Sequence, residues 1–409
     1  MEQLQQMPQA DNGKKHILLY IWVFLCFFIT DSPFANYAPM GYTFKVMVPM
    51  ILGVLYAAYY LLLKRSKLDV ARTVLLLFVL GTVALSSFLG NSGLRLVLAY
   101  IGMWLFGAFF TRIYSFESFR RVFLRCVLFV AAFSLIVYFM LLLFPASRSL
   151  FPTVAYSNGA TVDLFFTTFR LTSGPVRRNY GMFWEPGTYQ AYLNLALLFL
   201  FKEEGGRFLP AKALLLIVAI VTTFSTTGYI VMAAILCFGV LSGGRAFRGP
   251  LAKCVFVLSV IVLVCVALAN FGLVEDLVFD KMEAGNNSYD SRMLSIVGNL
   301  QLLLYHPILG VGYGMSADAL NLLVDSSSGF IHQTNTFTNY LATFGVILGG
   351  FFIWLWWKLA RVLSDRWTQA LPIFLIFVLI TSGENFLGSF AFTMFLAYGF
   401  RLLDVKLTK

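Results

Sequence analysis

The sequence predicts an all-α fold, a polytopic bundle of about twelve transmembrane helices, or ten to eleven because several spans are short. Of the 409 residues, 59% are hydrophobic and only 12% are charged. So few polar groups cannot cover a water-soluble globule of this size. Apolar runs of nearly ~20 residues, the length that crosses a bilayer, recur along almost the whole chain. We therefore expect a single integral membrane domain over residues 1–409.

The apolar runs define the predicted spans. The polar segment before Ile17 is too long for an ordinary secretory signal, so the first run is expected to remain in the protein. The spans are 17–30, 43–63, 70–88, 94–111, 122–144, 187–202, 209–225, 227–243, 254–272, 335–357, 369–383 and 386–400.

The basic residues predict the orientation, because cytoplasmic loops collect Lys and Arg. With Lys14 and Lys15 in the cytoplasm, the sides alternate consistently through all twelve spans and both termini are cytoplasmic. The formal charge of +11 is then explained by topology, and we expect no nucleic-acid partner. The other residues assigned to this side are Lys64, Arg65, Lys67, Arg112, Arg120, Arg121, Lys202, Arg207, Arg245, Arg248, Lys253, Lys358, Arg361, Arg366, Arg401, Lys406 and Lys409.

Two segments on the outer side, 145–186 and 273–334, are longer than ordinary loops and are the predicted working surface. The second contains Ser291–Leu304, whose apolar residues recur at helical spacing, so we expect a helix along the membrane surface. Eight basic residues lie on the outer side against the general bias: Lys45, Arg95, Arg148, Arg170, Arg177, Arg178, Lys281 and Arg292.

The first long segment ends in two arginines and a carboxylate, directly before an apolar span. Arg177 and Arg178 suit a phosphate or carboxylate ligand, because a guanidinium group presents a rigid fork of donors and stays charged. Alternatively, both are solvated or pair with lipid head groups. Glu185 precedes a proline that can begin a helix, and it is a candidate general base, arginine partner or carboxylate at the positive helix end.

The second long segment carries further candidates. Arg292 lies near the start of the predicted surface helix, and Gly310, Gly312 and Gly314 permit close approach to a ligand or another helix. His332 can exchange a proton near neutral pH, as general acid–base catalysis requires, or is a plain hydrogen-bonding residue.

An acid also interrupts the last pair of spans. Glu384 and Asn385 stand where the chain turns on the outer side, so they form either a hairpin turn only or part of a site. The glycine run at 310–314 neither follows a buried strand nor opens a nucleotide-binding unit, which excludes a Rossmann or P-loop interpretation.

Together these motifs resemble the O-antigen polymerase and O-antigen ligase superfamily of polytopic bacterial glycosyltransferases, the Wzy and ligase type. The likeness spans residues 177–349. Thr334 stands where the family usually has His, with His332 two residues earlier, and the Arg often found in the family's Ser/Thr-rich turn is absent. The matching residues are Arg178, Gly181, Glu185, Pro186 and Gly187; Ser225-Thr226-Thr227-Gly228; Arg292 with His306-Pro307 through Gly314; and Asn335, Leu341, Gly345 and Gly349.

The resemblance implies a membrane glycosyltransferase fold of the C class that transfers a glycan from a polyprenyl diphosphate to a sugar hydroxyl. On this basis Arg177, Arg178 and Arg292 bind the diphosphate, and Arg292 also acts in catalysis by stabilising charge on the leaving group. His332 or Glu185 then orients or deprotonates the accepting hydroxyl.

Four further residues are expected to contact the substrate: Tyr180, Trp184, Tyr313 and Asn335. Aromatic rings can stack on sugar faces, although an interfacial aromatic belt is the alternative. We expect no cofactor and no metal ion, because arginines can meet the diphosphate charge and the outer segments lack an obvious carboxylate pair for a metal.

The expected function is that of a surface-polysaccharide polymerase for O-antigen, capsule or exopolysaccharide. It moves a growing glycan from undecaprenyl diphosphate to the non-reducing-end sugar of another lipid-linked repeat unit, at the periplasmic face of the bacterial inner membrane. The alternatives are an O-antigen ligase, against which Thr334 counts, and a flippase or transporter of lipid-linked oligosaccharide, which should carry charges near the midplane. Besides the bilayer, a chain-length-regulating co-polymerase and a flippase are expected partners.

Overall fold

The computed structural model describes residues 12–63, 70–151, 153–155, 161–163, 170–171, 178–201, 210–241, 287–323, 333–364 and 366–402. Eleven of the twelve predicted spans coincide with helices, and 254–272 lies outside the described residues. The described helices are α1 (Asn12–Asp31), α2 (Pro33–Tyr37), α3 (Gly41–Ala58) with η2 (Tyr59–Leu63), α4 (Val70–Leu89), α5 (Leu94–Ile113), α6 (Phe116–Leu143), η3 (Pro145–Leu150), α7 (Pro186–Leu200), α8 (Pro210–Thr222), α9 (Thr226–Leu241), α12 (Asn287–Tyr305), α13 (Ser316–Leu323), α14 (Thr336–Leu363), α15 (Trp367–Ile380) and α16 (Phe390–Arg401).

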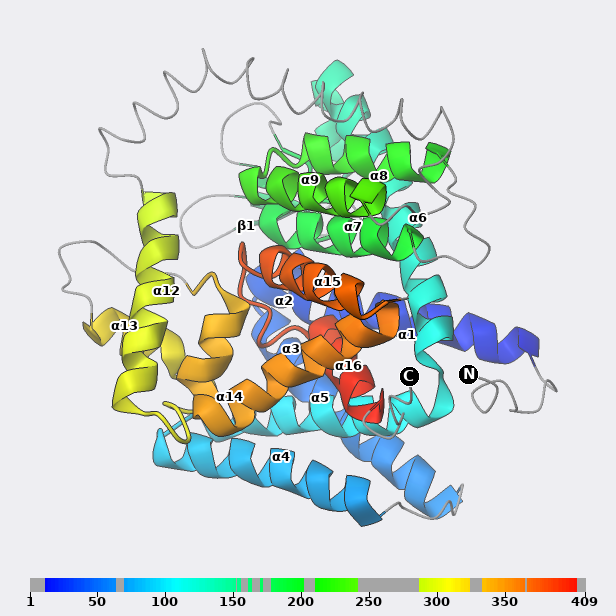
Figure 1. Cartoon of the computed structure of the whole chain (residues 1–409). Helices are drawn as coiled ribbons and strands as arrows, with labels where there is room; N and C mark the ends of the chain where they lie inside the picture. Colours follow the sequence, from blue (N-terminus) through cyan, green and yellow to red (C-terminus); the bar gives the residue numbers. More distant parts are fainter. Residues whose placement is uncertain are drawn as a thin grey trace.

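The helices form the predicted membrane bundle, and the all-α fold class is confirmed. Six helices of the described part are long and apolar enough to cross a bilayer, namely those within Ile17–Tyr37, Gly41–Leu62, Arg72–Leu89, Leu94–Ile113, Phe116–Leu143 and Thr336–Leu363. Figure 1 shows most of them side by side, with α7, α8 and α9 stacked on one edge and α4 on the other. The chain is a multi-pass membrane protein.

Helix α7 is the innermost element, because every residue from Pro186 to Leu200 is buried. A helix that is apolar almost all round is stable only when other helices surround it. Helices α6, α8 and α9 pack directly against it. The position of its first turn is therefore fixed by the whole bundle, and this turn carries the candidate site.

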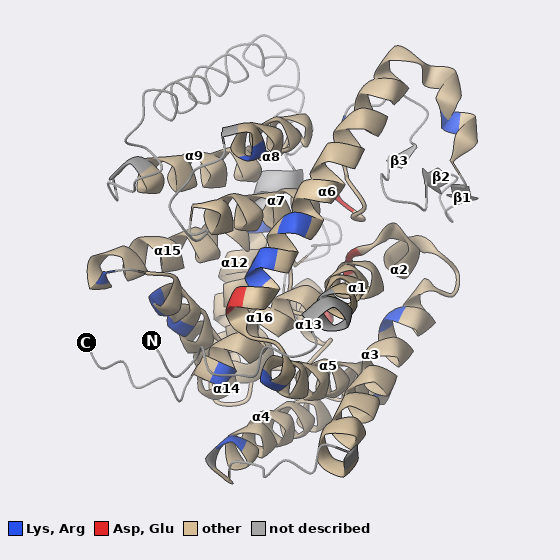
Figure 2. Ribbon diagram, turned by 90° about the vertical axis from the view of Figure 1, so that its right-hand side faces the viewer, with Lys and Arg blue, Asp and Glu red and all other residues tan. Residues whose placement is uncertain are grey.

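Basic residues gather at one end of the bundle. The starts of α4, α6 and α8 carry Lys or Arg, as do the ends of α5, α14 and α16. Figure 2 looks at the side of the bundle on which α1 begins, and the basic residues of these helix ends lie toward the viewer. We call this the basic side; it fits the bias expected of a cytoplasmic face.

Helix α12 covers the opposite end of the bundle and runs across the direction of helices such as α4, α7, α8 and α9 (Figure 1). Met293, Val297, Leu300 and Leu304 are exposed, with Leu304 at 79%. The inner face is more polar, and Ser295 and Asn299 on it are fully buried. The helix predicted over Ser291–Leu304 is thus present within α12. An apolar face turned outward suits a helix in contact with lipid, and its position along the membrane surface stays a prediction.

The segment 145–186 contains a feature that the periodicity did not predict. Strands β1 (Thr153–Ala155), β2 (Thr161–Asp163) and β3 (Arg170–Leu171) form a small antiparallel sheet in the order β1-β2-β3. Strands of two or three residues are too short for alternation of apolar and polar residues to be recognised.

The glycine run at 310–314 packs against helices. Helix α14 is kinked at Gly345, whose φ is +67°, and the kink frees backbone carbonyls in the preceding turn. Val311 N donates to Ala342 O at 2.9 Å and Gly312 N donates to Thr343 O at 2.9 Å. The glycines therefore allow close approach to another helix, which is one of the two roles that the sequence left open.

Candidate functional site

Four charged side chains from different parts of the chain meet at the first turn of α7, on the side opposite the basic side. Arg178 and Glu185 lie in the segment before α7, Arg292 lies on α12, and Glu384 lies in the turn between α15 and α16. Both arginines and Glu185 are close enough to Glu384 to act on its ionisation. The structure thus brings together three predicted site residues, and it adds Glu384.

Arg178 is held by the turn between α8 and α9. Its Nε donates to Thr223 O at 2.9 Å, and the adjacent Asn179 N donates to Thr222 O at 2.8 Å. Phe224 follows in this turn with a φ of +48°, a backbone conformation that residues other than glycine rarely adopt. A strained turn thus presents the Thr223 carbonyl to Arg178.

Asn179 strengthens this anchor from a fully buried position. Its Nδ2 donates to Thr222 Oγ1 at 3.1 Å and to Ser134 Oγ at 3.2 Å, and its Oδ1 accepts from Gly181 N at 2.9 Å. These bonds satisfy the buried amide and fix the backbone next to Arg178. The guanidinium group is therefore placed by α6 and α8 together.

Arg292 reaches the site from α12. Its Nη1 donates to Thr227 Oγ1 at 3.0 Å, in the first turn of α9. A Cβ placed on Gly383 would lie 3.1 Å from Thr227 Cγ2, so this contact also borders the turn that carries Glu384. The sequence singled out Thr227 only as part of the Ser/Thr-rich turn, and the structure shows what its hydroxyl does.

Glu185 is the N-cap residue of α7, in extended conformation directly before Pro186. The preceding Trp184 is held at its backbone: its N donates to Asp31 O at 3.0 Å, and its O accepts from Tyr37 Oη at 3.3 Å. The N-terminus of a helix favours negative charge, so a carboxylate is well placed here.

Glu384 is buried, with 8% of its surface exposed. Its Oε1 lies against Gly187, where any side chain would overlap it. Its backbone is fixed by Thr336, whose Oγ1 donates to Glu384 O at 2.9 Å and accepts from Phe386 N at 2.9 Å. Glu384 is thereby tied to the start of α14.

Burial raises the pKa of Glu384 well above the usual value for a glutamate, and the negative charge of Glu185 raises it further. The guanidinium groups of Arg292 and Arg178 act in the opposite direction, but the raising effects prevail. Glu384 therefore holds its proton to a higher pH than an exposed glutamate does.

A buried amide pair lies beneath the four charges. Asn194 Nδ2 donates to Gln190 Oε1 at 3.0 Å and to Gly228 O at 3.2 Å. Gln190 is fully buried, and its Nε2 has no hydrogen-bond partner within the described part of the chain. This nitrogen lies 3.5 Å from a Cβ placed on Gly383, so an unused donor points toward the Glu384 turn.

The remaining predicted site residues lie in different surroundings. Arg177 and His332 lie outside the described residues. Tyr180 and Trp184 are partly buried in the segment next to the charges. Tyr313 is 9% exposed and stacks on Tyr100 with ring centroids 4.3 Å apart, which leaves little of its ring for a sugar.

Asn335 is the N-cap of α14, where its Oδ1 accepts from Thr338 N at 2.9 Å. Thr334, at the family's customary His position, has a buried Oγ1 with no partner among the residues described. Nearby, Gln333 Nε2 donates to Asn299 Oδ1 at 2.9 Å, which joins α12 to the start of α14. The sequence did not single out Gln190 or Thr336, since neither carries charge or belongs to a recognised motif.

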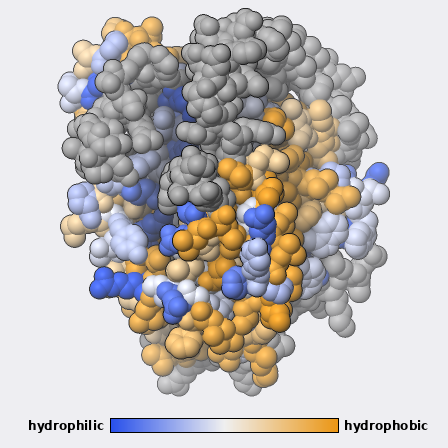
Figure 3. Space-filling view, turned by 90° about the vertical axis from the view of Figure 1, so that its left-hand side faces the viewer, coloured by the Kyte–Doolittle hydropathy of each residue, from blue (hydrophilic) through white to orange (hydrophobic). Residues whose placement is uncertain are grey.

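The surface on this side is mixed in polarity. Figure 3 looks at the face that carries α12 and α13, and it shows hydrophilic residues set back between areas of apolar surface. Among the residues that the structure describes, no group of three His, Cys, Asp or Glu side chains is placed to hold a metal ion. Metal independence stays a prediction.

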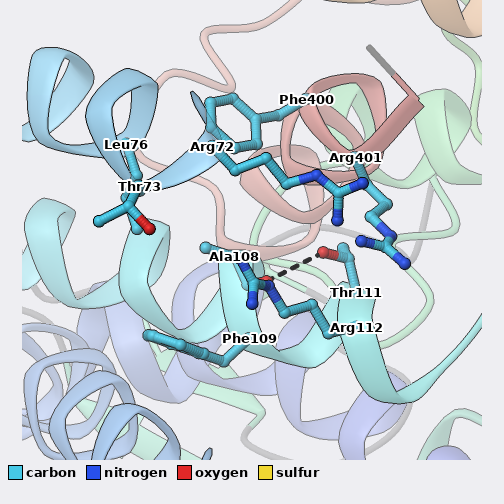
Figure 4. A pocket seen from close by; sticks show the side chains of 9 residues that line it. All are labelled: Arg72, Thr73, Leu76, Ala108, Phe109, Thr111, Arg112, Phe400 and Arg401. Carbon is cyan, nitrogen blue, oxygen red and sulfur yellow. Dashed lines mark hydrogen bonds between the residues drawn. The ribbon is translucent and has the colours of Figure 1, made fainter. Parts of the chain in front are cut away.

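A second group of arginines lies at the basic side. Arg72, Arg112 and Arg401 line a cavity of about 50 Å³ between α4, α5 and α16 (Figure 4). Arg112 also lies over the ring of Tyr60, 5.1 Å from its centroid. Basic residues at cytoplasmic helix ends are the rule in membrane proteins, so we do not assign the candidate site here.

Comparison with known families supports the predicted resemblance. Residues 211–355 match the family model described as O-antigen ligase. The match runs from α8 into α14 and includes Thr227 and Arg292, whereas Arg178, Glu185 and Glu384 lie outside it. No curated protein and no solved structure matches the chain. Residues 211–355 of this multi-pass membrane protein are thus similar to the O-antigen ligase family.

Proposed function

We propose that this protein is a polymerase of surface polysaccharide. It transfers a growing glycan from undecaprenyl diphosphate to the non-reducing-end sugar of another lipid-linked repeat unit. The observation that carries the proposal is the convergence of Arg178 and Arg292 with two carboxylates at the first turn of α7. The O-antigen ligase family match, which indicates an enzyme acting on lipid-linked glycans, supports the same chemistry.

The two arginines suit a diphosphate leaving group. As the bond from the anomeric carbon breaks, negative charge develops on the diphosphate, and donors that are already in place stabilise it most effectively where water is scarce. Arg178 is fixed through Nε to the Thr223 carbonyl, and Arg292 through Nη1 to Thr227. Each bond orients a guanidinium group without using all its donors. Arg177 is proposed to join this group.

The accepting hydroxyl needs a base. We assign this role to Glu185 or His332, as the sequence predicted. The position of Glu185 near Glu384, on which both arginines also act, supports the former. Tyr180 and Trp184 precede Glu185 closely enough to contact the sugars of the substrate. No metal ion is required, because the arginines meet the diphosphate charge.

The lipid carrier requires a path from the bilayer to the site. Helix α12 supports such a path, because it carries Arg292 while exposing apolar residues on its outer face. The proposed membrane is the bacterial inner membrane, with the site in the periplasm. A flippase would then supply the repeat units, and a co-polymerase would regulate chain length.

Arg292→Ala tests the proposal. The purified full chain is supplied with undecaprenyl-diphosphate-linked repeat units, and product length is followed on gels. We expect wild-type protein to form a ladder and Arg292→Ala to lose about 10²–10³-fold in rate, as on removing one charge-stabilising donor. Arg121→Ala is the control, since Arg121 lies on the basic side and is 43% exposed. Undiminished polymerisation by Arg292→Ala would remove Arg292 from the mechanism.

A ligase of the same superfamily is the second candidate, and it is the activity that the description of the matching family names. The chemistry at the diphosphate is the same, but the acceptor is the lipid A core. Thr334 in place of His argues for the polymerase. Supplying both acceptors in one reaction decides between the two: glycan on the lipid A core identifies a ligase, and longer lipid-linked chains identify a polymerase.

A further inference from the structure

The two carboxylates of the site differ in environment. Glu185 is partly exposed at the N-cap of α7, whereas Glu384 is buried against Gly187. Two neighbouring carboxyl groups in a buried place do not both ionise readily. When environments push the ionisation of two carboxyl groups apart, one is suited to act as an acid and the other as a base.

The charges that face Glu384 come from two directions. Glu185 and Arg178 approach from the segment before α7, and Arg292 approaches from α12. With both glutamates ionised, they would offset the two guanidinium charges. With the proton retained on Glu384, the group keeps one net positive charge, which is what an incoming diphosphate requires.

We propose that Glu384 is the general acid of the transfer reaction, giving its proton to the leaving diphosphate oxygen. This inference rests on the proposed function. The bond between the anomeric carbon and that oxygen breaks, and its electron pair stays on the oxygen, which takes the Glu384 proton. The acceptor oxygen forms the new glycosidic bond and loses its proton to Glu185. Return of this proton from Glu185 to Glu384 restores the resting enzyme.

The surroundings hold Glu384 in place for this step. Thr336 fixes its backbone through two hydrogen bonds, and Gly187 leaves room for its carboxyl group. The buried Gln190 Nε2, which lacks a partner among the described residues, adds a donor on the same side of the site. An unpaired buried donor is costly, so a substrate oxygen that bonds to it would bind favourably.

Glu384→Gln tests the assignment, because the amide preserves shape and neutrality but cannot give up a proton. We expect kcat to fall by about 10²-fold, within the range of general acid catalysis, with KM for the lipid-linked donor unchanged. Wild-type activity should decline as the pH rises through the pKa of Glu384, and this alkaline decline should be absent from the residual activity of Glu384→Gln. Glu185→Gln should instead remove the decline on the acid side.

Gly187→Ala tests the geometry without removing an ionisable group. The added methyl overlaps Glu384 Oε1, so the carboxyl group must move and kcat should fall. Gly81→Ala is the matched control, because a Cβ on Gly81 meets nothing within 4 Å and its activity should equal that of wild type.

The outcomes separate the two proposals. If wild-type protein elongates no chains, the proposed function fails and the inference fails with it. If the wild type polymerises while Glu384→Gln or Gly187→Ala retains full kcat, only the role of Glu384 is overturned. Should Glu384→Gln not be recovered folded, Gly187→Ala alone decides.

Discussion

Thr227 controls the position of Arg292 with a single hydroxyl group, through the 3.0 Å bond to Nη1. Thr227→Val keeps the shape of the side chain but removes the acceptor. We expect donor affinity to fall roughly tenfold, because a hydrogen bond to a charged group contributes about 1.5–3 kcal/mol. Thr227→Ser keeps the hydroxyl and should bind like wild type. Binding of lipid-linked donor to the purified variants checks this, and equal affinity in Thr227→Val would contradict it.

Individual residues of the site differ in how far the sequence could predict their roles. The sequence could predict Arg178, Glu185 and Arg292 as candidates, because local motifs marked all three and basic residues on the outer side of a membrane bundle are unusual. Tyr313 was predicted to contact sugar because aromatic rings can do so, yet its ring is used to stack on Tyr100. Contacts between residues far apart in the chain place Tyr313, such as the bond from its backbone N to Ser87 Oγ, 226 positions away.

The role of Glu384 could not be predicted from the sequence either. The sequence marked it as a turn residue or a site residue but could not choose, because the choice depends on where the turn after α15 lies. The structure places that turn against Gly187 and Thr336. Both contacts are long-range, and no periodicity along the chain reports them.

Among the helices, the kink of α14 brings its backbone into contact with the 306–314 segment. Gly345 has φ +67°, and a Cβ there would overlap Ile308 O. Val346 N beyond the kink donates to Pro307 O at 2.8 Å. The kink therefore lets the backbones of α14 and the 306–314 segment satisfy each other's hydrogen-bonding groups.

Gly345→Ala should destabilise the protein, because the residue then carries both backbone strain and an overlap. The strain alone costs about 1–3 kcal/mol. Gly350→Ala is the matched control in the same helix, since a Cβ there meets nothing within 4 Å. Thermal unfolding of both variants in detergent checks the prediction. A melting temperature of Gly345→Ala equal to that of Gly350→Ala would mean that the kink is not required.

Helix boundaries were well predicted where a long apolar run decides them, as in 94–111 for α5 (Leu94–Ile113). The span predicted for α6 (Phe116–Leu143) began too late, at 122, because the start of the helix carries Glu117, Arg120 and Arg121. Ser115 caps this turn by accepting from Ser118 N at 3.2 Å, and Arg120 pairs with Glu117 at 2.7 Å. A hydropathy pattern does not detect a helix start whose first turn is polar, whereas a capping residue such as Ser115 indicates it.

For the whole molecule, function depends on which side of the membrane holds the four charges of the site. The bundle is polarised, with basic helix ends on one side and α12 on the other (Figures 1 and 2). Such an arrangement predicts that the α7 first turn faces the periplasm. A lipid-linked polysaccharide is extended outside the cytoplasm only if this orientation holds.

Single cysteines in a variant lacking the five native cysteines test the orientation. Asp318→Cys lies exposed on α13, beside α12, and Tyr180→Cys lies in the segment before α7. Both should react with a membrane-impermeant maleimide added to cells with a permeabilised outer membrane. Arg121→Cys, exposed on the basic side, should react only after the inner membrane is opened. If Tyr180→Cys and Asp318→Cys were protected while Arg121→Cys reacted in cells with an intact inner membrane, the topology would be the reverse of the predicted one. A periplasmic polymerase could not then use this site.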